Sequence, residues 1–278
     1  MPSSDLYKKA KQLLYQEYEQ AYEIVKGSPY HKMFADEKIK HSLQVSGAGN
    51  GILAHEPYFQ NKSADFVEMA RVAVLLHDIY RFREIVGLYQ NEPRIDHSIK
   101  GAEFLADTKD FNNILITMPV KHHGHMIEAL YEDQVFQNLD EQTKDAVKHI
   151  AFAVRDADKI ANWCLLCHEC DNMREVWLPF ADDYSVKQGQ ISSNLWNGFM
   201  QMTLLPGRFK TTNADMALSV ICWLFDINYT YSIKYCKDLK LFDKWLILLQ
   251  NLHVDSTQIS TIYDVMKQYV DQKFNIKI

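Results

Sequence analysis

Metal-ligating side chains are the residues of this sequence best suited to chemistry. The pair His77-Asp78 directly follows the apolar run Val72–Leu76, which places an imidazole and a carboxylate at the deep end of a buried helix. A buried aspartate needs a compensating charge, and a metal ion supplies one. Further side chains of these two kinds occur at wide spacings, at His41, His97, His122, His123 and Asp158. Imidazole and carboxylate ligands suit Mn, Fe, Co, Ni, Zn or Mg, so we predict a site for one or two divalent ions.

The order of these residues resembles the H…HD…D signature of the HD-domain superfamily of metal-dependent phosphohydrolases. The similarity lies in IKHSLQV around His41, ARVAVLLHDIYRF around His77-Asp78 and VRDADKIANW around Asp158. Two further stretches, DHSIKGAEFL and VKHHGH, resemble the surroundings of the extra histidines in members that bind two metals. Because no GYP tripeptide follows VKHHGH, the cyclic-dinucleotide branch that it marks is not indicated. The resemblance covers about residues 35–165.

The resemblance implies a helical bundle and a set of metal ligands. The residues that match the ligands of the first ion are His41, His77, Asp78 and Asp158. Asp78 is then expected to bridge to a second ion held by His97 and His122. His123 is either a further ligand or a residue that supports a ligand or contacts phosphate.

The segment RDAD leaves a choice between Asp156 and Asp158, which point in different directions on a helix. Asp158 is preferred because ADKIAN resembles the family stretch A-D-[RK]-[LI]-x-N. Asn162, one turn later, is then expected to contact the substrate.

Basic residues near these positions are candidates for holding a phosphate. Arg81 lies three residues after Asp78 and offers a forked guanidinium, although it could instead pair with Glu84. Lys121 and Lys159 are weaker candidates, because solvated charge is the commoner state of a lysine. We therefore expect His77, Asp78, Arg81 and Lys159 to take part in catalysis. The expected substrate contacts are Arg81, Lys121, Lys159 and Asn162.

Structural roles compete with several of these assignments. His77 and Asp78 could form a buried hydrogen-bonded pair, and His97 and His122 could make ordinary polar contacts beside a single metal. Cys164, Cys167 and Cys170 give C-x2-C-x2-C, but they continue a helix and have no fourth clustered cysteine, so core thiols are favoured over an iron–sulfur cluster. The C-terminal aromatic residues recur at helical spacing, which indicates core packing.

Composition and periodicity predict an all-α protein. The 278 residues include only 10 glycines and 7 prolines, too few for the turns of a sheet-rich fold. Apolar residues recur at helical spacing in eight segments. These are Leu6–Val25, about Asp36–Val45, Ser63–Leu76, His97–Leu105, a segment after Pro119, Gln142–Trp163, Met216–Leu239 and Phe242–Leu252. We predict a single domain over residues 1–278, with an HD-like core over about 30–178 and a C-terminal helical extension over about 179–278.

Charge, apolar runs and cysteine count indicate which partners and which compartment to expect. The 30 basic and 36 acidic residues give a net charge of −6, which argues against binding a nucleic-acid polymer. No apolar run approaches the ~18 residues of a membrane span, and the N-terminal segment lacks the apolar core of a signal peptide. The odd count of five cysteines also favours a reducing compartment, so a cytoplasmic protein is expected.

These observations favour a metal-dependent phosphohydrolase that acts on a small phosphate ester, for which a nucleotide is one candidate. Two alternatives keep the same ligands. Some HD-like proteins use a two-iron version of the site as oxygenases, and others could sense a nucleotide without hydrolysing it. The sequence does not separate monoesters from diesters, nor does it identify the metal.

Overall fold

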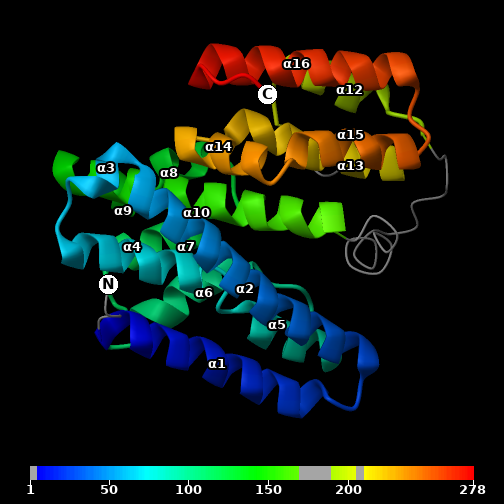
Figure 1. The fold of residues 1–278 in the computed structure, drawn as a ribbon. Coiled ribbons are helices and arrows are strands. Elements are labelled where there is room, and N and C mark those ends of the chain that lie inside the picture. Colours follow the sequence, from blue (N-terminus) through cyan, green and yellow to red (C-terminus); the bar gives the residue numbers. More distant parts are fainter. Residues whose placement is uncertain (1–4, 169–188, 205–209) are drawn as a thin grey trace. The chain divides into compact units, whose positions relative to one another are not determined.

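The computed structural model describes residues 5–168, 189–204 and 210–278, and every regular element in these ranges is a helix (Figure 1). This confirms the predicted all-α fold class. The chain divides into two compact units, Met1–Asp158 and Lys159–Ile278, with the boundary inside helix α10. The predicted division into an HD-like core and an extension from about residue 179 stays a prediction. None of the described helices is long and apolar enough to cross a membrane.

The first unit is a bundle in which helix α4 is central. Its helices are α1 (Asp5–Val25), α2 (Pro29–His55), α3 (Pro57–Gln60), α4 (Ala64–Leu76), α5 (Arg81–Tyr89), α6 (His97–Ala106), α7 (Ile114–His122), α8 (Glu128–Glu132), α9 (Gln134–Gln137) and the first part of α10 (Glu141–His168). Helix α4 packs against α1, α2 and α7, and α6 packs against α7. Because α4 is apolar and buried from Val72 to Leu76, it carries the residues that follow it, His77 and Asp78, into the interior.

Side-chain caps fix where the helices next to the site begin. The Ser63 hydroxyl accepts a hydrogen bond from the backbone N–H of Phe66 at the start of α4, as is typical of a serine at this position. The Asp96 carboxylate accepts from the N–H groups of Ser98 and Ile99, so α6 starts at His97. In the same way Asn113 caps α7.

Helices α2 and α7 differ from their predicted bounds near the site. Helix α2 continues through Gly47, Gly49 and Gly51 to His55 instead of ending near Val45. Gly49 explains this course, since a Cβ there would lie 2.4 Å from Val74 Cγ1, so glycine lets α2 approach α4 closely. Helix α7 begins at Ile114 rather than after Pro119, because the Asn113 cap starts it earlier and Pro119 lies inside the helix.

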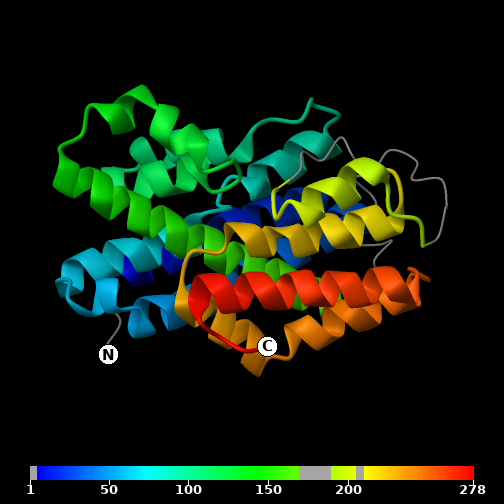
Figure 2. The same ribbon diagram turned by 90° about the horizontal axis from the view of Figure 1, so that it is seen from above.

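The second unit comprises the rest of α10 and a group of shorter helices. These are α12 (Ser193–Met200), α13 (Asn213–Ile221), the 3-10 helix η3 (Cys222–Asp226), α14 (Thr230–Asp238), α15 (Leu241–Asn251) and α16 (Ser256–Phe274). Figure 2 shows α16 beside α14 and α15, against which it packs. The rings of Trp163 and Trp245 meet at 4.8 Å between centroids in its core. Phe199 is also fully buried, in line with the predicted core role of the aromatic residues.

The predicted continuous helix Met216–Leu239 is interrupted in the structure. Backbone carbonyls in the break are bound from α16: the Tyr269 hydroxyl donates to Phe225 O at 2.8 Å and Lys273 Nζ donates to Ile227 O at 2.7 Å. These partners replace intrahelical hydrogen bonds and so stabilise the break. Of the three clustered cysteines, Cys164 is a half-buried free thiol on α10, whereas the Cys167 side chain and Cys170 lie outside the described residues.

Candidate metal centre

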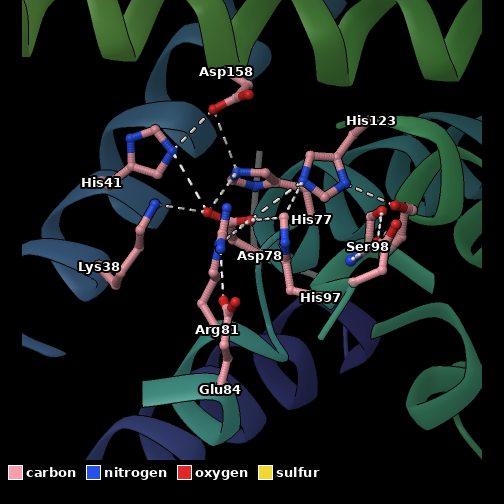
Figure 3. Close-up of polar contacts among 12 residues, drawn as sticks. Lys38, His41, His77, Asp78, Arg81, Glu84, His97, Ser98, His123 and Asp158 are labelled. Atoms are coloured by element: carbon pink, nitrogen blue, oxygen red, sulfur yellow. Dashed lines mark hydrogen bonds and ion pairs between the residues drawn. The ribbon is translucent and has the colours of Figure 1, made fainter. Parts of the chain in front are cut away.

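Six ligand-type side chains from five helices converge inside the first unit (Figure 3). They are His41 on α2, His77 and Asp78 at the end of α4, His97 at the start of α6, His123 just after α7, and Asp158 on α10. All except His97 and Asp158 are buried. The packing of the bundle therefore brings together residues that are far apart in the sequence.

One group that could hold an ion consists of His41, His77 and Asp158. The His41 ring donates from Nε2 to Asp158 Oδ1 at 2.9 Å, and His77 Nε2 lies 3.7 Å from the same oxygen. The ligand atoms of this group all lie within 4.8 Å of one another. Asp158, rather than Asp156, is thus the aspartate of RDAD that joins the cluster.

A second group consists of His77, Asp78 and His123. His97 lies beside it, with Nε2 at 3.1 Å from Asp78 Oδ1, while His123 Nε2 is 3.3 Å from the same oxygen. The other oxygen, Asp78 Oδ2, is 3.9 Å from His41 Nε2. Because its two oxygens face the two groups, Asp78 has the geometry of a bridging carboxylate.

The hydrogen bonds of the two central histidines fit a cation between them. The His77 ring donates from Nδ1 to Val74 O at 3.0 Å, and the His123 ring donates from Nδ1 to Val120 O at 2.7 Å. In a neutral imidazole this assignment leaves a lone pair on Nε2. His77 Nε2 is buried and has no hydrogen-bond partner, and His123 Nε2 faces the Asp78 carboxylate. Lone pairs and a carboxylate facing one another are repulsive unless a cation lies among them, so these residues fit a metal.

The protonation states support the same conclusion. Burial lowers the pKa of His77 to about 3, so its ring is neutral and able to ligate. Burial raises the pKa of Asp78, but the positive charges of Lys38 and Arg81 outweigh it and hold that pKa well below its usual range. The hydrogen bond from His41 likewise overcomes burial and lowers the pKa of Asp158. His77 therefore offers a neutral imidazole, and Asp78 and Asp158 offer ionised carboxylates.

His122 differs from the sequence-based expectation that it holds the second ion. Its Nε2 lies 3.0 Å from Asp133 Oδ2, and Lys121 Nζ donates to the same oxygen at 2.6 Å. Asp133 is fixed in turn, because it caps α9 by accepting from the N–H groups of Val135 and Phe136. Neighbouring residues at a helix end point in different directions, so His123 rather than His122 faces the second group. Lys121, predicted to bind substrate, is engaged by Asp133 instead.

The remaining predicted residues divide between the two units. Arg81 lies at the centre, with Nε at 3.6 Å from Asp78 Oδ1 and Nη1 at 2.6 Å from Glu84 Oε2, so the pairing with Glu84 is present and phosphate binding by Arg81 stays a prediction. Lys159 and Asn162 belong to the second unit, where Lys159 Nζ pairs with Asp226 at 2.8 Å. Their roles in catalysis and substrate binding stay predictions.

Sequence reasoning missed Lys38, whose ammonium is 3.1 Å from Asp78 Oδ2. A signal for it exists in the sequence, because Lys38 precedes His41 by three residues. Residues at this spacing lie on one face of a helix, so a lysine there accompanies the histidine into the site.

Comparison with known proteins agrees with the site. Residues 39–163 match the family model described as HD domain, a range that contains all six ligand-type residues. HD domains bind divalent metals and form a superfamily of metal-dependent phosphohydrolases. The match confirms the resemblance that the sequence motifs indicated. No curated protein and no solved structure gives a significant match to this chain.

Proposed function

We propose that this chain, which carries an HD domain over residues 39–163, hydrolyses a small phosphate ester at a centre of two divalent ions. The observation that carries the proposal is the pair of ligand groups joined by Asp78, whose two oxygens face opposite groups. A single-ion site would not need histidines on both sides of this carboxylate. Paired divalent ions are a recurrent arrangement for phosphoryl transfer.

Each ion has a ligand set in this proposal. The residues that would hold the first ion are His41, His77, Asp78 and Asp158. Those that would hold the second are Asp78, His97 and His123. Bound there, divalent ions would polarise the phosphoryl oxygens and supply a nucleophile by lowering the pKa of a coordinated water. The donors suit Mn, Fe, Co, Ni, Zn or Mg.

The protein's own residues orient the ligands and the substrate. The carbonyls of Val74 and Val120 fix the rings of His77 and His123, so the lone pairs point inward. Arg81 is placed to bind a phosphoryl oxygen, because its buried Nε has no hydrogen-bond partner while Glu84 holds the other side of the guanidinium. A guanidinium fixed in this way loses little freedom when a phosphate binds.

The test is purification without added metal, metal analysis, and a screen for phosphate release over nucleotides and sugar phosphates. We expect divalent metal in the protein and metal-dependent release of phosphate from at least one ester. Oxygen consumption by the iron-loaded protein without phosphate release would contradict hydrolysis and favour a two-iron oxygenase with the same ligands. If the protein bound a nucleotide tightly but hydrolysed it with none of several metals, this would contradict hydrolysis and favour a nucleotide sensor.

A further inference from the structure

Lys38 is a charged residue of the centre that the proposed hydrolysis leaves without a role. It lies on α2, and Figure 3 shows its ammonium pointing at Asp78, 3.1 Å from Oδ2. Its side chain is 26% exposed, so the ammonium reaches the centre from a partly solvated side. Because Asp78 is buried, this contact joins the ammonium to a carboxylate that is shielded from solvent.

We propose that Lys38 binds the substrate, and that Lys38 and Arg81 together select a phosphomonoester dianion over a diester. The inference rests on the proposed hydrolytic function and names its substrate class. When ions occupy the two groups, both oxygens of Asp78 serve as their ligands. The ammonium of Lys38 would then lie beside cations, and an anion bound at the same place would stabilise it.

The two basic residues lie beside different oxygens of Asp78. Lys38 contacts Oδ2, and Arg81 Nε is 3.6 Å from Oδ1. A terminal phosphate has three non-bridging oxygens, enough to contact the ions and both basic residues at once. A diester has only two such oxygens, and its second ester group would occupy the position of the third. The arrangement therefore fits a terminal phosphate.

The charges of the centre favour the same substrate. Two cations, Lys38 and Arg81, stand against the three carboxylates of Asp78, Asp158 and Glu84, which leaves one net negative charge. Two divalent ions change this to three positive charges. A monoester dianion neutralises two of these charges, whereas a diester monoanion neutralises one.

Lys40 provides a matched control on the same helix. It pairs with Glu37 on α2 at 2.7 Å, and its side chain is 64% exposed. Replacing Lys40 removes the same charge from the same helix without touching Asp78. If the lost charge weakened phosphate binding only through long-range electrostatics, both variants would be affected. If Lys38 contacts the phosphate, only replacement of Lys38 weakens binding.

The experiment measures binding of orthophosphate and dimethyl phosphate to the Mn-loaded protein by calorimetry, at a pH where orthophosphate is a dianion. We expect Lys38→Met to weaken orthophosphate binding by about tenfold or more, the effect of losing a charge-assisted hydrogen bond. Lys38→Arg should retain part of the affinity, and Lys40→Met should match wild type. Wild type should bind orthophosphate more tightly than dimethyl phosphate. Metal content should not fall in any variant, because Lys38 repels the ions.

Several results would overturn the proposal. Orthophosphate affinity could be unchanged in Lys38→Met, or it could fall equally in Lys40→Met. Wild type could bind orthophosphate and dimethyl phosphate with equal affinity. Loss of metal from Lys38→Met would show that Lys38 is a structural partner of Asp78. Lys38→Gln repeats the test with a polar side chain. Because binding is measured without turnover, a protein that binds orthophosphate through Lys38 but hydrolyses no ester would refute the proposed function alone.

Discussion

At the level of single residues, the same kind of hydrogen bond orients both central ligands, His77 and His123. His77 and His123 each follow the end of a helix, and each donates from Nδ1 to the carbonyl three residues earlier, Val74 O or Val120 O. Carbonyls in the last turn of a helix lack intrahelical partners, so they are available for this use. The helix ends therefore select the tautomer that leaves Nε2 free to ligate.

The neighbouring histidines make a sharp test of the second ion. His123→Ala should leave one ion per chain, because it removes an Nε2 that lies 3.3 Å from Asp78 Oδ1. His122→Ala should keep both ions, because that ring is engaged by Asp133. Metal analysis after reconstitution with Mn distinguishes the two variants. Loss of an ion from His122→Ala with both ions retained in His123→Ala would restore the sequence-based assignment.

The sequence predicted which residue types gather at the site better than which individual residues do so. The motif around His77-Asp78 is strong because an apolar helix leads directly into it. The choice between His122 and His123 depends on the rotation of one residue at the end of α7, and Asp133 decides it. That contact joins residues 11 positions apart and leaves no periodic signal.

At the level of helices and loops, Arg155 on α10 binds the backbone of the segment His122–His125, which follows α7. It is only 3% exposed, and its Nη1 donates to the carbonyls of His122 and His123 at 3.2 Å each, and also to that of His125. It is one helical turn from Asp158, so the helix that carries one ligand also holds the segment that carries another.

Arg155→Met should therefore lower both stability and the affinity for the second ion. The buried carbonyls would lose a charged donor, at a cost of about 2–3 kcal/mol in the free energy of unfolding. Denaturant unfolding measures the first effect and metal titration the second. Unchanged values for both quantities would show that the loop is held by other contacts.

The packing of α2 on α4 gives a second prediction at this scale. Gly49→Ala should destabilise the protein by about 1–3 kcal/mol, since the added Cβ would overlap Val74 Cγ1. Gly47→Ala is the control, because no atom lies within 4 Å of a Cβ there, and it should be neutral or slightly stabilising. Urea unfolding of the two variants gives the comparison. Equal effects at both positions would contradict close helix packing at Gly49.

Periodicity predicted α4 and α6 to within one residue of their bounds, but not the ends of α2 and α7, and it gave no prediction for α16. The glycines of α2 suggest a helix end in sequence and are instead accommodated by a neighbouring helix. The break after Ile221 depends on Tyr269 and Lys273, about 45 residues further along the chain. Contacts of this kind come from tertiary packing, and local sequence does not reveal them.

At the scale of the whole molecule, the candidate ligands all belong to the first compact unit, Met1–Asp158. Metal binding should therefore stabilise this unit. At a metal concentration one hundred times the dissociation constant, the expected gain is about 2.7 kcal/mol in the free energy of unfolding. Thermal unfolding with Mn and with a chelator measures it. Asp78→Ala should show no such difference, and a metal-dependent shift in that variant would place the ions elsewhere.

In the proposed function, Asp78 would bridge two ions that together support phosphate ester hydrolysis. The most direct test of this proposal is the metal content of wild type and of Asp78→Ala after reconstitution with Mn, measured together with phosphate release. We expect two ions per wild-type chain, and neither bound metal nor turnover in Asp78→Ala, because no nearby carboxylate can take the bridging position. A wild type that saturates at one ion, or an Asp78→Ala protein that keeps its metal and its turnover, would contradict the proposal.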